Sequence, residues 1–153
     1  MVMLDVDGVM TDGHIIFGTD GTEYKSFHAH DGYGMTRALE HGLRLAFISG
    51  RKSFVVRKRA KQFGIKDVYE NRIDKVNVFE VLKKKHKLQN NEAAFIGDDE
   101  FDLPLLHIVG FSAAPADAIA QVRKEVAYVT KAKGGRGAIR EVLDMILRAK
   151  GLI

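Results

Sequence analysis

The chain has 153 residues, of which 46% are hydrophobic and 29% charged, as in globular proteins with a buried core. The absence of cysteine excludes disulfides, thiolate metal sites and cysteine nucleophiles. No apolar run approaches the roughly 18 residues of a membrane span, and from the opening residues we expect no export signal. We therefore expect one cytoplasmic domain, residues 1–153, without a membrane partner. The net charge of +4 by itself is compatible with nucleic acid, an anionic small molecule or neither.

Along the chain, short apolar runs alternate with amphipathic helical stretches. Runs of strand length occupy residues 2–6, 43–48, 93–96, 110–113 and 127–130. Apolar residues at helical spacing occupy residues 31–41, 53–63, 74–86, 99–108, 116–124 and 138–150. This alternation predicts an α/β fold, a three-layer Rossmann-like parallel sheet with helices on both faces.

Residues 13–27 interrupt the alternation. They read as an apolar run (HIIF), a Gly/Asp turn (GTDG) and a second strand-like run (TEYKSF), which predicts an antiparallel β-hairpin. The hairpin stands where an α/β protein would place its first crossover helix. We expect it either to cover a site after the first strand or to supply an assembly surface.

Carboxylates, glycines and a serine follow three of the predicted strands. In an open parallel sheet ligands bind beyond the carboxyl ends of the strands, so these residues should meet at one edge. They are Asp5, Asp7, Gly8, Ser49, Gly50, Gly97, Asp98 and Asp99. A single aspartate among them could merely cap a helix or bind backbone amides. Three strand ends of the same type favour a common site.

Asp5 and Asp7 are two positions apart, which on an extended strand end places both side chains on the same side. Together with Asp98 they would form the oxygen-rich environment that Mg²⁺ prefers. The sequence therefore predicts a magnesium site at this edge.

Ser49 and Gly50 offer a hydroxyl and backbone amides to a phosphate, or simply a helix cap. Lys75 begins a predicted helix, where it would either place a positive charge against a phosphoryl group or lie in solvent. These residues point to phosphate chemistry only in combination.

Four ordered motifs resemble those of the haloacid dehalogenase superfamily. They are Asp5-x-Asp7-Gly8, Ile48-Ser49-Gly50-Arg51, Asp74-Lys75 and Gly97-Asp98-Asp99-x-x-Asp102. Further stretches resemble, within that superfamily, the phosphatases that act on 3-deoxy-D-manno-octulosonate 8-phosphate, an intermediate of lipopolysaccharide inner-core synthesis. These stretches are Thr11-Asp12-Gly13, the hairpin, Asp31-Gly32-x-Gly34 and Gly134-Gly135-x-Gly137-Ala138.

The resemblance implies a role for each carboxylate. Asp5 would attack phosphorus and form an aspartyl-phosphate, and Asp7 would protonate the leaving oxygen and then activate water. Magnesium would be held by the Asp5 carboxylate, the Asp7 carbonyl and Asp98. Asp99 and Asp102 would orient the groups around it.

The resemblance further implies that Ser49 and Lys75 hold the phosphoryl oxygens. It implies that the hairpin replaces the cap domain of other members and assembles four subunits into a homotetramer. The first strand starts at Val2 without the residues that precede it in most relatives, so we expect either an unusually short chain or one whose beginning is missing from this sequence.

The expected substrate is a phosphorylated sugar acid bound by Gly50, Arg51, Arg59 and Arg136. Arg51 and Arg59 would lie two turns apart on one helical face and fork onto the carboxylate, although Arg59 could equally be solvated. Arg136 belongs to a Gly-rich basic loop that is either a surface loop or, by resemblance, approaches the site. Phosphatases of nine-carbon sialic-type sugars carry Glu where Arg51 stands, which favours the eight-carbon acid.

Three alternatives stay open from the sequence. One is the same chemistry on another sugar phosphate, such as a sialic-type 9-phosphate. The others are a phospho-acceptor domain and a regulatory or assembly domain. A nucleic-acid substrate is disfavoured because the basic residues are scattered and tryptophan is absent. His28 and His30 alternate on a predicted strand end, where a structural or substrate-edge role is favoured over metal binding.

Overall fold

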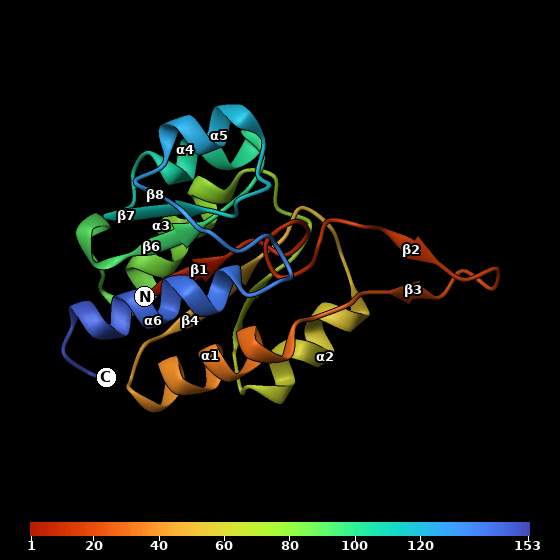
Figure 1. Ribbon diagram of the computed structural model, residues 1–153, viewed down its shortest axis with the longest axis horizontal. Coiled ribbons are helices and arrows are strands. Elements are labelled where there is room, and N and C mark those ends of the chain that lie inside the picture. Colours follow the sequence, from red (N-terminus) through yellow and green to blue (C-terminus); the bar gives the residue numbers. More distant parts are fainter.

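The computed structural model describes all residues 1–153 and has a six-stranded parallel sheet at its centre (Figure 1). The strands are β1 (Val2–Leu4), β4 (Leu45–Ile48), β5 (Asp67–Tyr69), β6 (Ala94–Ile96), β7 (Phe111–Ala114) and β8 (Tyr128–Val129). Their order is β5-β4-β1-β6-β7-β8, and every neighbouring pair is parallel. The predicted α/β sheet is confirmed.

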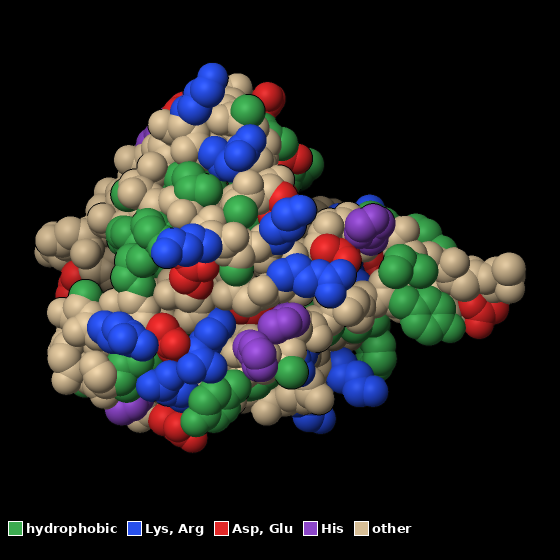
Figure 2. Space-filling model, in the orientation of Figure 1, with side chains coloured by type: hydrophobic (Ala, Val, Ile, Leu, Met, Phe, Trp, Pro, Cys, Tyr) green, Lys and Arg blue, Asp and Glu red, His purple; other side chains and the backbone are tan.

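The predicted hairpin is present as β2 (Ile16–Phe17) and β3 (Glu23–Tyr24), paired antiparallel. Gly21, with a φ of 81°, completes the turn, because a left-handed backbone costs glycine little. The hairpin projects from the carboxyl end of the sheet, and hydrophobic side chains gather on its surface (Figures 1 and 2). The exposed apolar residues of this segment are Ile15, Ile16, Phe17 and Tyr24.

The helices cover both faces of the sheet (Figure 1). They are α1 (Ala29–Glu40), α2 (Phe54–Gln62), α3 (Lys75–His86), α4 (Leu103–Leu106), α5 (Ala120–Glu125) and α6 (Ala138–Ala149), with short 3₁₀ helices η1 (Asn90–Glu92) and η2 (Glu100–Asp102). No helix is long and apolar enough to cross a membrane.

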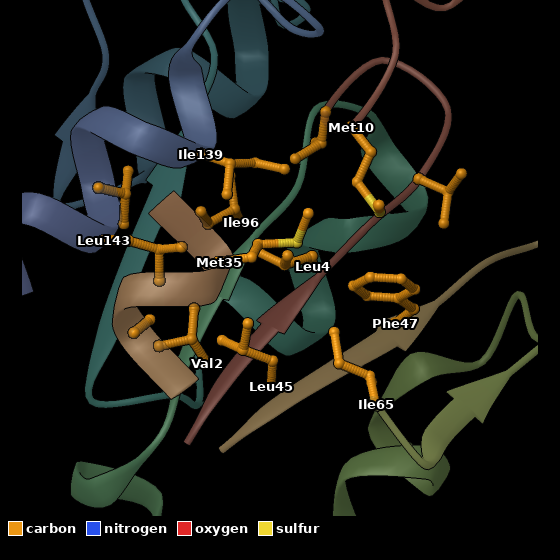
Figure 3. Packing of buried hydrophobic residues seen from close by; sticks show 14 of the residues in the cluster. Val2, Leu4, Met10, Met35, Leu45, Phe47, Ile65, Ile96, Ile139 and Leu143 are labelled. Carbon is orange, nitrogen blue, oxygen red and sulfur yellow. The ribbon is translucent and has the colours of Figure 1, made fainter. Parts of the chain in front are cut away.

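Two hydrophobic clusters form, one on each face, because successive strand residues point to opposite sides. In β1, Val2 and Leu4 pack with α1, α2 and α6, whereas Met3 packs with α3, α4 and α5. Figure 3 shows Val2 and Leu4 beside residues of α1 and α6. Both clusters contain fully buried aromatic rings, Phe47 in the first and Phe79 and Phe95 in the second. The sheet is therefore held rigidly between two cores, which fixes where its strand ends lie.

Strand β5 was not expected from the sequence. It is three residues long at the edge of the sheet and begins with a buried carboxylate, so no apolar run announces it. Asp67 is tolerated there because Lys85 and His86 of α3 contact its two oxygens at 2.6 and 2.8 Å. The predicted helix 99–108 is divided into η2 and α4, and the predicted helix 116–124 begins only at Ala120.

Asp31 connects two helices of the first core. It lies in the first turn of α1, is 2% exposed, and accepts hydrogen bonds from the backbone N–H groups of Gly137 (3.1 Å) and Arg140 (2.8 Å). These N–H groups lie at the start of α6, where they have no acceptor within the helix. The cap position of α6 is Gly137, which has no side chain to accept them. Burial raises the pKa of Asp31, against the lowering effect of both N–H donors. Asp31 therefore caps α6 from a neighbouring helix.

We predict that Asp31→Ala lowers the free energy of unfolding by about 2 kcal/mol, because two buried N–H groups lose their acceptor. Asp31→Asn keeps an acceptor oxygen and should lose less. Glu40→Ala, an exposed change in the same helix, should stay within about 0.5 kcal/mol of wild type. Urea unfolding of the three variants tests this, and an Asp31→Ala protein as stable as Glu40→Ala would contradict the capping role.

Candidate active site

The carboxyl ends of β1, β4 and β6 open into a cavity of about 380 Å³. Strand β1 lies between the other two, so the chain leaves it in one direction and later returns on its other side, which is where open α/β sheets bind ligands. The cavity is lined by Asp5, Asp7, Gly13, Ser49, Gly50, Arg51, Ile73, Asp98, Asp99 and Phe101. The structure thus brings the predicted strand-end residues together.

Lys75 is the buried positive charge of the site. It is the first residue of α3, which Asp74 caps by accepting the N–H of Asn77 at 3.2 Å. Its ammonium bonds to Oδ1 of Asp5 and lies 2.6 Å from Oδ1 of Asp102. Burial alone would lower the pKa of Lys75, but the two carboxylates outweigh it and raise that pKa. Lys75 is therefore held as a cation without contact with solvent.

Asp102 organises the loop after β6. It is fully buried, and its Oδ2 accepts the backbone N–H groups of Asp98 (2.9 Å) and Asp99 (3.3 Å). A Cβ at Gly97 would lie 2.6 Å from this carboxylate, so the loop can close on Asp102 only with glycine there. Asp99 caps η2 by accepting the N–H of Glu100 at 2.7 Å. Asp102 thus positions both Lys75 and the Asp98–Asp99 backbone.

Asp5, Asp98 and Asp102 each offer an oxygen within 4.8 Å of the others. Oδ2 of Asp5 and Oδ1 of Asp98 are buried without a hydrogen-bond partner. Burial raises the pKa of Asp5 despite Lys75, and burial followed by the charges of Asp5 and Asp102 raises that of Asp98. Three carboxylates facing one ammonium are an environment that a hard divalent cation would stabilise. The residues fit magnesium.

Ser49 and Arg51 lie at the end of β4. Ser49 is 2% exposed, and its hydroxyl accepts the backbone N–H of Arg51 at 3.1 Å. Helix α2 starts only at Phe54, with Ser53 as its cap. The prediction that Arg51 and Arg59 share a helical face is therefore wrong, because Arg51 precedes the helix. Ser49 does not cap α2, which leaves its hydroxyl at the cavity.

Arg59 lies away from the cavity lining. Its guanidinium carbon lies over the rings of Phe27 (5.3 Å to the centroid) and Phe63 (4.7 Å), and a Cβ at Gly32 would lie 2.7 Å from the guanidinium. Burial lowers its pKa. The cation–π contacts and the close approach to Gly32 give Arg59 a packing role between α1 and α2.

The Gly-rich loop 131–137 reaches the loop after β1. A Cβ at Gly134 would lie 1.8 Å from the carbonyl oxygen of Gly8, so this close approach requires glycine. Arg136 is exposed, and its guanidinium lies 3.6 Å from Oδ2 of Asp12. The loop is anchored by Glu141, which accepts the backbone N–H groups of residues 131 and 132. The structure places Arg136 beside the loop after β1 rather than in the cavity lining.

The two histidines do not lie on a strand end, and that prediction is wrong. His28 precedes α1 as its cap residue and His30 lies in its first turn, because the helix begins at Ala29, between the two histidines. Their rings stack edge to face with centroids 5.0 Å apart.

Lys25 was not predicted as a site residue, yet its ammonium bonds to Oδ1 of Asp7 from the base of the hairpin. One signal was available. Glu23 and Lys25 are two apart in a predicted strand, so they share a face and form a charged pair there. Ile73 and Phe101, the two apolar residues of the cavity lining, were not predicted either.

Comparisons with known proteins agree with this geometry. A family model for haloacid dehalogenase-like hydrolases matches residues 57–143. The 3-deoxy-D-manno-octulosonate 8-phosphate phosphatase KdsC of Escherichia coli K12 is 41% identical over 151 residues, which cover 99% of this chain and 80% of that protein.

Two crystal structures have nearly the same fold. The 3-deoxy-D-manno-octulosonate 8-phosphate phosphatase of Yersinia pestis has a TM-score of 0.97 and 40% identity, covering 99% of this chain and 82% of its own. That of Moraxella catarrhalis, in complex with magnesium, phosphate and KDO, has a TM-score of 0.96 and 38% identity, covering 99% and 87%. With its strand-end carboxylates, its buried lysine and these relatives, the chain belongs to the haloacid dehalogenase-like hydrolases.

Proposed function

We propose that this chain is a magnesium-dependent phosphatase that hydrolyses 3-deoxy-D-manno-octulosonate 8-phosphate to the free sugar acid and phosphate. The observation that carries the proposal is the buried Asp5–Lys75–Asp102 contact beside unpartnered oxygens of Asp5 and Asp98 in one cavity. The similarity to phosphatases of this substrate over 99% of the chain supports the choice of substrate.

Magnesium would be held by the Asp5 carboxylate, the backbone carbonyl of Asp7 and Asp98. When bound, it would neutralise charge between the nucleophile and the phosphoryl group. Asp102 and Asp99 would orient these residues without binding the metal. Asp102 contacts the Lys75 ammonium and accepts the backbone N–H of Asp98.

The proposed reaction has two steps. An Asp5 oxygen attacks phosphorus, the bond between phosphorus and the sugar oxygen breaks, and Asp7 gives its proton to that oxygen. Asp7 then takes a proton from water, which attacks the aspartyl-phosphate, releases phosphate and restores Asp5. The Ser49 hydroxyl, the Gly50 backbone N–H and the Lys75 ammonium hold the phosphoryl oxygens during both steps.

For the sugar acid, we assign Arg51, which lines the cavity, to the carboxylate, and Arg136 to the edge of the site. The guanidinium of Arg59 contacts the rings of Phe27 and Phe63, so we assign Arg59 no role in binding substrate in the cavity of its own subunit. The nine-carbon sialic-type phosphates are the competing substrates. The enzyme would act in the cytoplasm, in synthesis of the lipopolysaccharide inner-core sugar, and would not bind nucleic acid.

We predict that the wild-type protein with magnesium releases phosphate from 3-deoxy-D-manno-octulosonate 8-phosphate faster than from sialic-type 9-phosphates and simple sugar phosphates. Asp5→Asn should lower kcat by about 10³-fold or more, because the amide oxygen cannot act as the nucleophile. A malachite-green assay across the panel measures both. Preference for a nine-carbon substrate would overturn the substrate assignment, and an active Asp5→Asn protein would overturn the nucleophile.

We predict that magnesium stabilises the wild-type fold, by about 2.7 kcal/mol when its concentration is 100 times Kd. Asp98→Ala should abolish this response and, without metal, should be at least as stable as wild type because like charges are removed. Thermal unfolding in EDTA and in magnesium measures both effects. An equal magnesium response in Asp98→Ala would contradict the site.

We also propose a homotetramer assembled through the hairpin, whose Ile16, Phe17 and Tyr24 are 49%, 60% and 54% exposed. We predict that Phe17→Asp yields smaller species in size-exclusion chromatography with light scattering, because burying a carboxylate at an apolar contact is costly. Val81→Asp, a matched change at an exposed residue of α3, should leave the wild-type mass unchanged. A monomeric wild-type protein would refute the assembly.

A further inference from the structure

Lys25 is a buried cation on an otherwise exposed element. It directly follows β3, yet its side chain is 1% exposed. Its ammonium bonds to Oδ1 of Asp7 and lies 3.4 Å from Oε1 of Glu23. Burying an ammonium is costly unless it is paired, so its position is set by these two carboxylates.

Asp7 has no other hydrogen-bond or ion-pair partner for its side chain. Its carboxylate lines the cavity and follows the loop that leaves β1. An aspartate without a partner would populate several rotamers. The orientation of the Asp7 carboxylate in the cavity therefore depends on Lys25.

Lys25 is in turn anchored through Glu23. Oε2 of Glu23 accepts the Ser53 hydroxyl at 2.5 Å, and its Oε1 lies 3.9 Å from the guanidinium of Arg51. Glu23 and Lys25 point to the same side because they are two apart in an extended segment, whereas Tyr24 between them is exposed. The hairpin base is thus tied to the start of α2 and to the loop after β1.

We propose that Lys25 is a positioning residue for proton transfer in the reaction proposed above, on which this inference rests. Lys25 holds Oδ1 of Asp7 and leaves the second oxygen free. That oxygen gives its proton to the departing sugar oxygen and later takes one from the attacking water. The hairpin therefore supplies a functional contact within its own subunit, in addition to any surface for assembly.

The test compares two substrates that differ in their need for a proton. The sugar phosphate leaves as an alkoxide that must be protonated, whereas p-nitrophenolate leaves without one. In Lys25→Met we expect kcat/KM for the sugar phosphate to fall by about 10²-fold, in line with the loss of a well-placed general acid. The kcat/KM for p-nitrophenyl phosphate should change by less than about threefold. Lys25→Arg, which keeps the charge and the donors, should restore part of the loss.

Lys61→Met, an exposed lysine of α2, is the matched control and should behave as wild type on both substrates. An equal loss on both substrates in Lys25→Met, or no loss on either, would overturn the proposal. If Lys25→Met does not fold, Lys25→Arg is compared instead. A loss of kcat/KM for the sugar phosphate alone supports the proposal, and an equal loss for both substrates overturns it.

Failure of the proposed function gives a different result, because wild type itself would then fail to hydrolyse the sugar phosphate. In that case the sugar phosphate is replaced by an alkyl phosphate from the panel that wild type does hydrolyse. This substrate is then compared with p-nitrophenyl phosphate in the same way. The Lys25 inference is supported or overturned by that pair in the same way.

Discussion

The site depends on the burial of the Lys75 ammonium between the carboxylates of Asp5 and Asp102. An ammonium without solvent contact is stable only when it is paired, and the two partners come from different segments, Asp5 from the end of β1 and Asp102 from η2 after β6. The contact therefore ties the start of α3 to the loops after β1 and β6. Both hydrophobic cores converge on this arrangement, because the strands they enclose end at these carboxylates.

The same contact leaves the site with an excess of negative charge. Asp98 joins Asp5 and Asp102, and one ammonium cannot neutralise three carboxylates. The buried oxygens of Asp5 and Asp98 that lack a hydrogen-bond partner show where positive charge is still missing. Since burial disfavours the charged form of each carboxylate, a bound cation and the folded arrangement would stabilise one another. Metal binding and rigidity at this edge of the sheet thus have a common electrostatic origin.

The hairpin combines two surfaces with different chemistry. Its surface exposes apolar residues, while at its base Lys25 contacts Asp7 in the loop after β1 and Glu23 contacts Ser53 at the start of α2. At the base of the hairpin the alternation of side chains separates the two, because Tyr24 is exposed between Glu23 and Lys25. The proposed assembly surface and the proposed contact with Asp7 thus belong to one short insertion.

Sequence alone determined the alternation of strands and helices, the hairpin and the carboxylates at the strand ends, because these follow from local periodicity and from glycine and aspartate spacing. It did not reveal β5, a short edge strand that begins with Asp67, whose buried carboxylate is paired by Lys85 and His86 of α3. It put Arg51 and Arg59 on one face, whereas Ser53 starts the helix after Arg51. It passed over Lys25, whose partner is 18 residues away. The start of α2 is a local feature, set by the Ser53 cap, whereas β5 and the Lys25–Asp7 contact were decided by tertiary structure, because burial and charge pairing join residues that are far apart in the sequence.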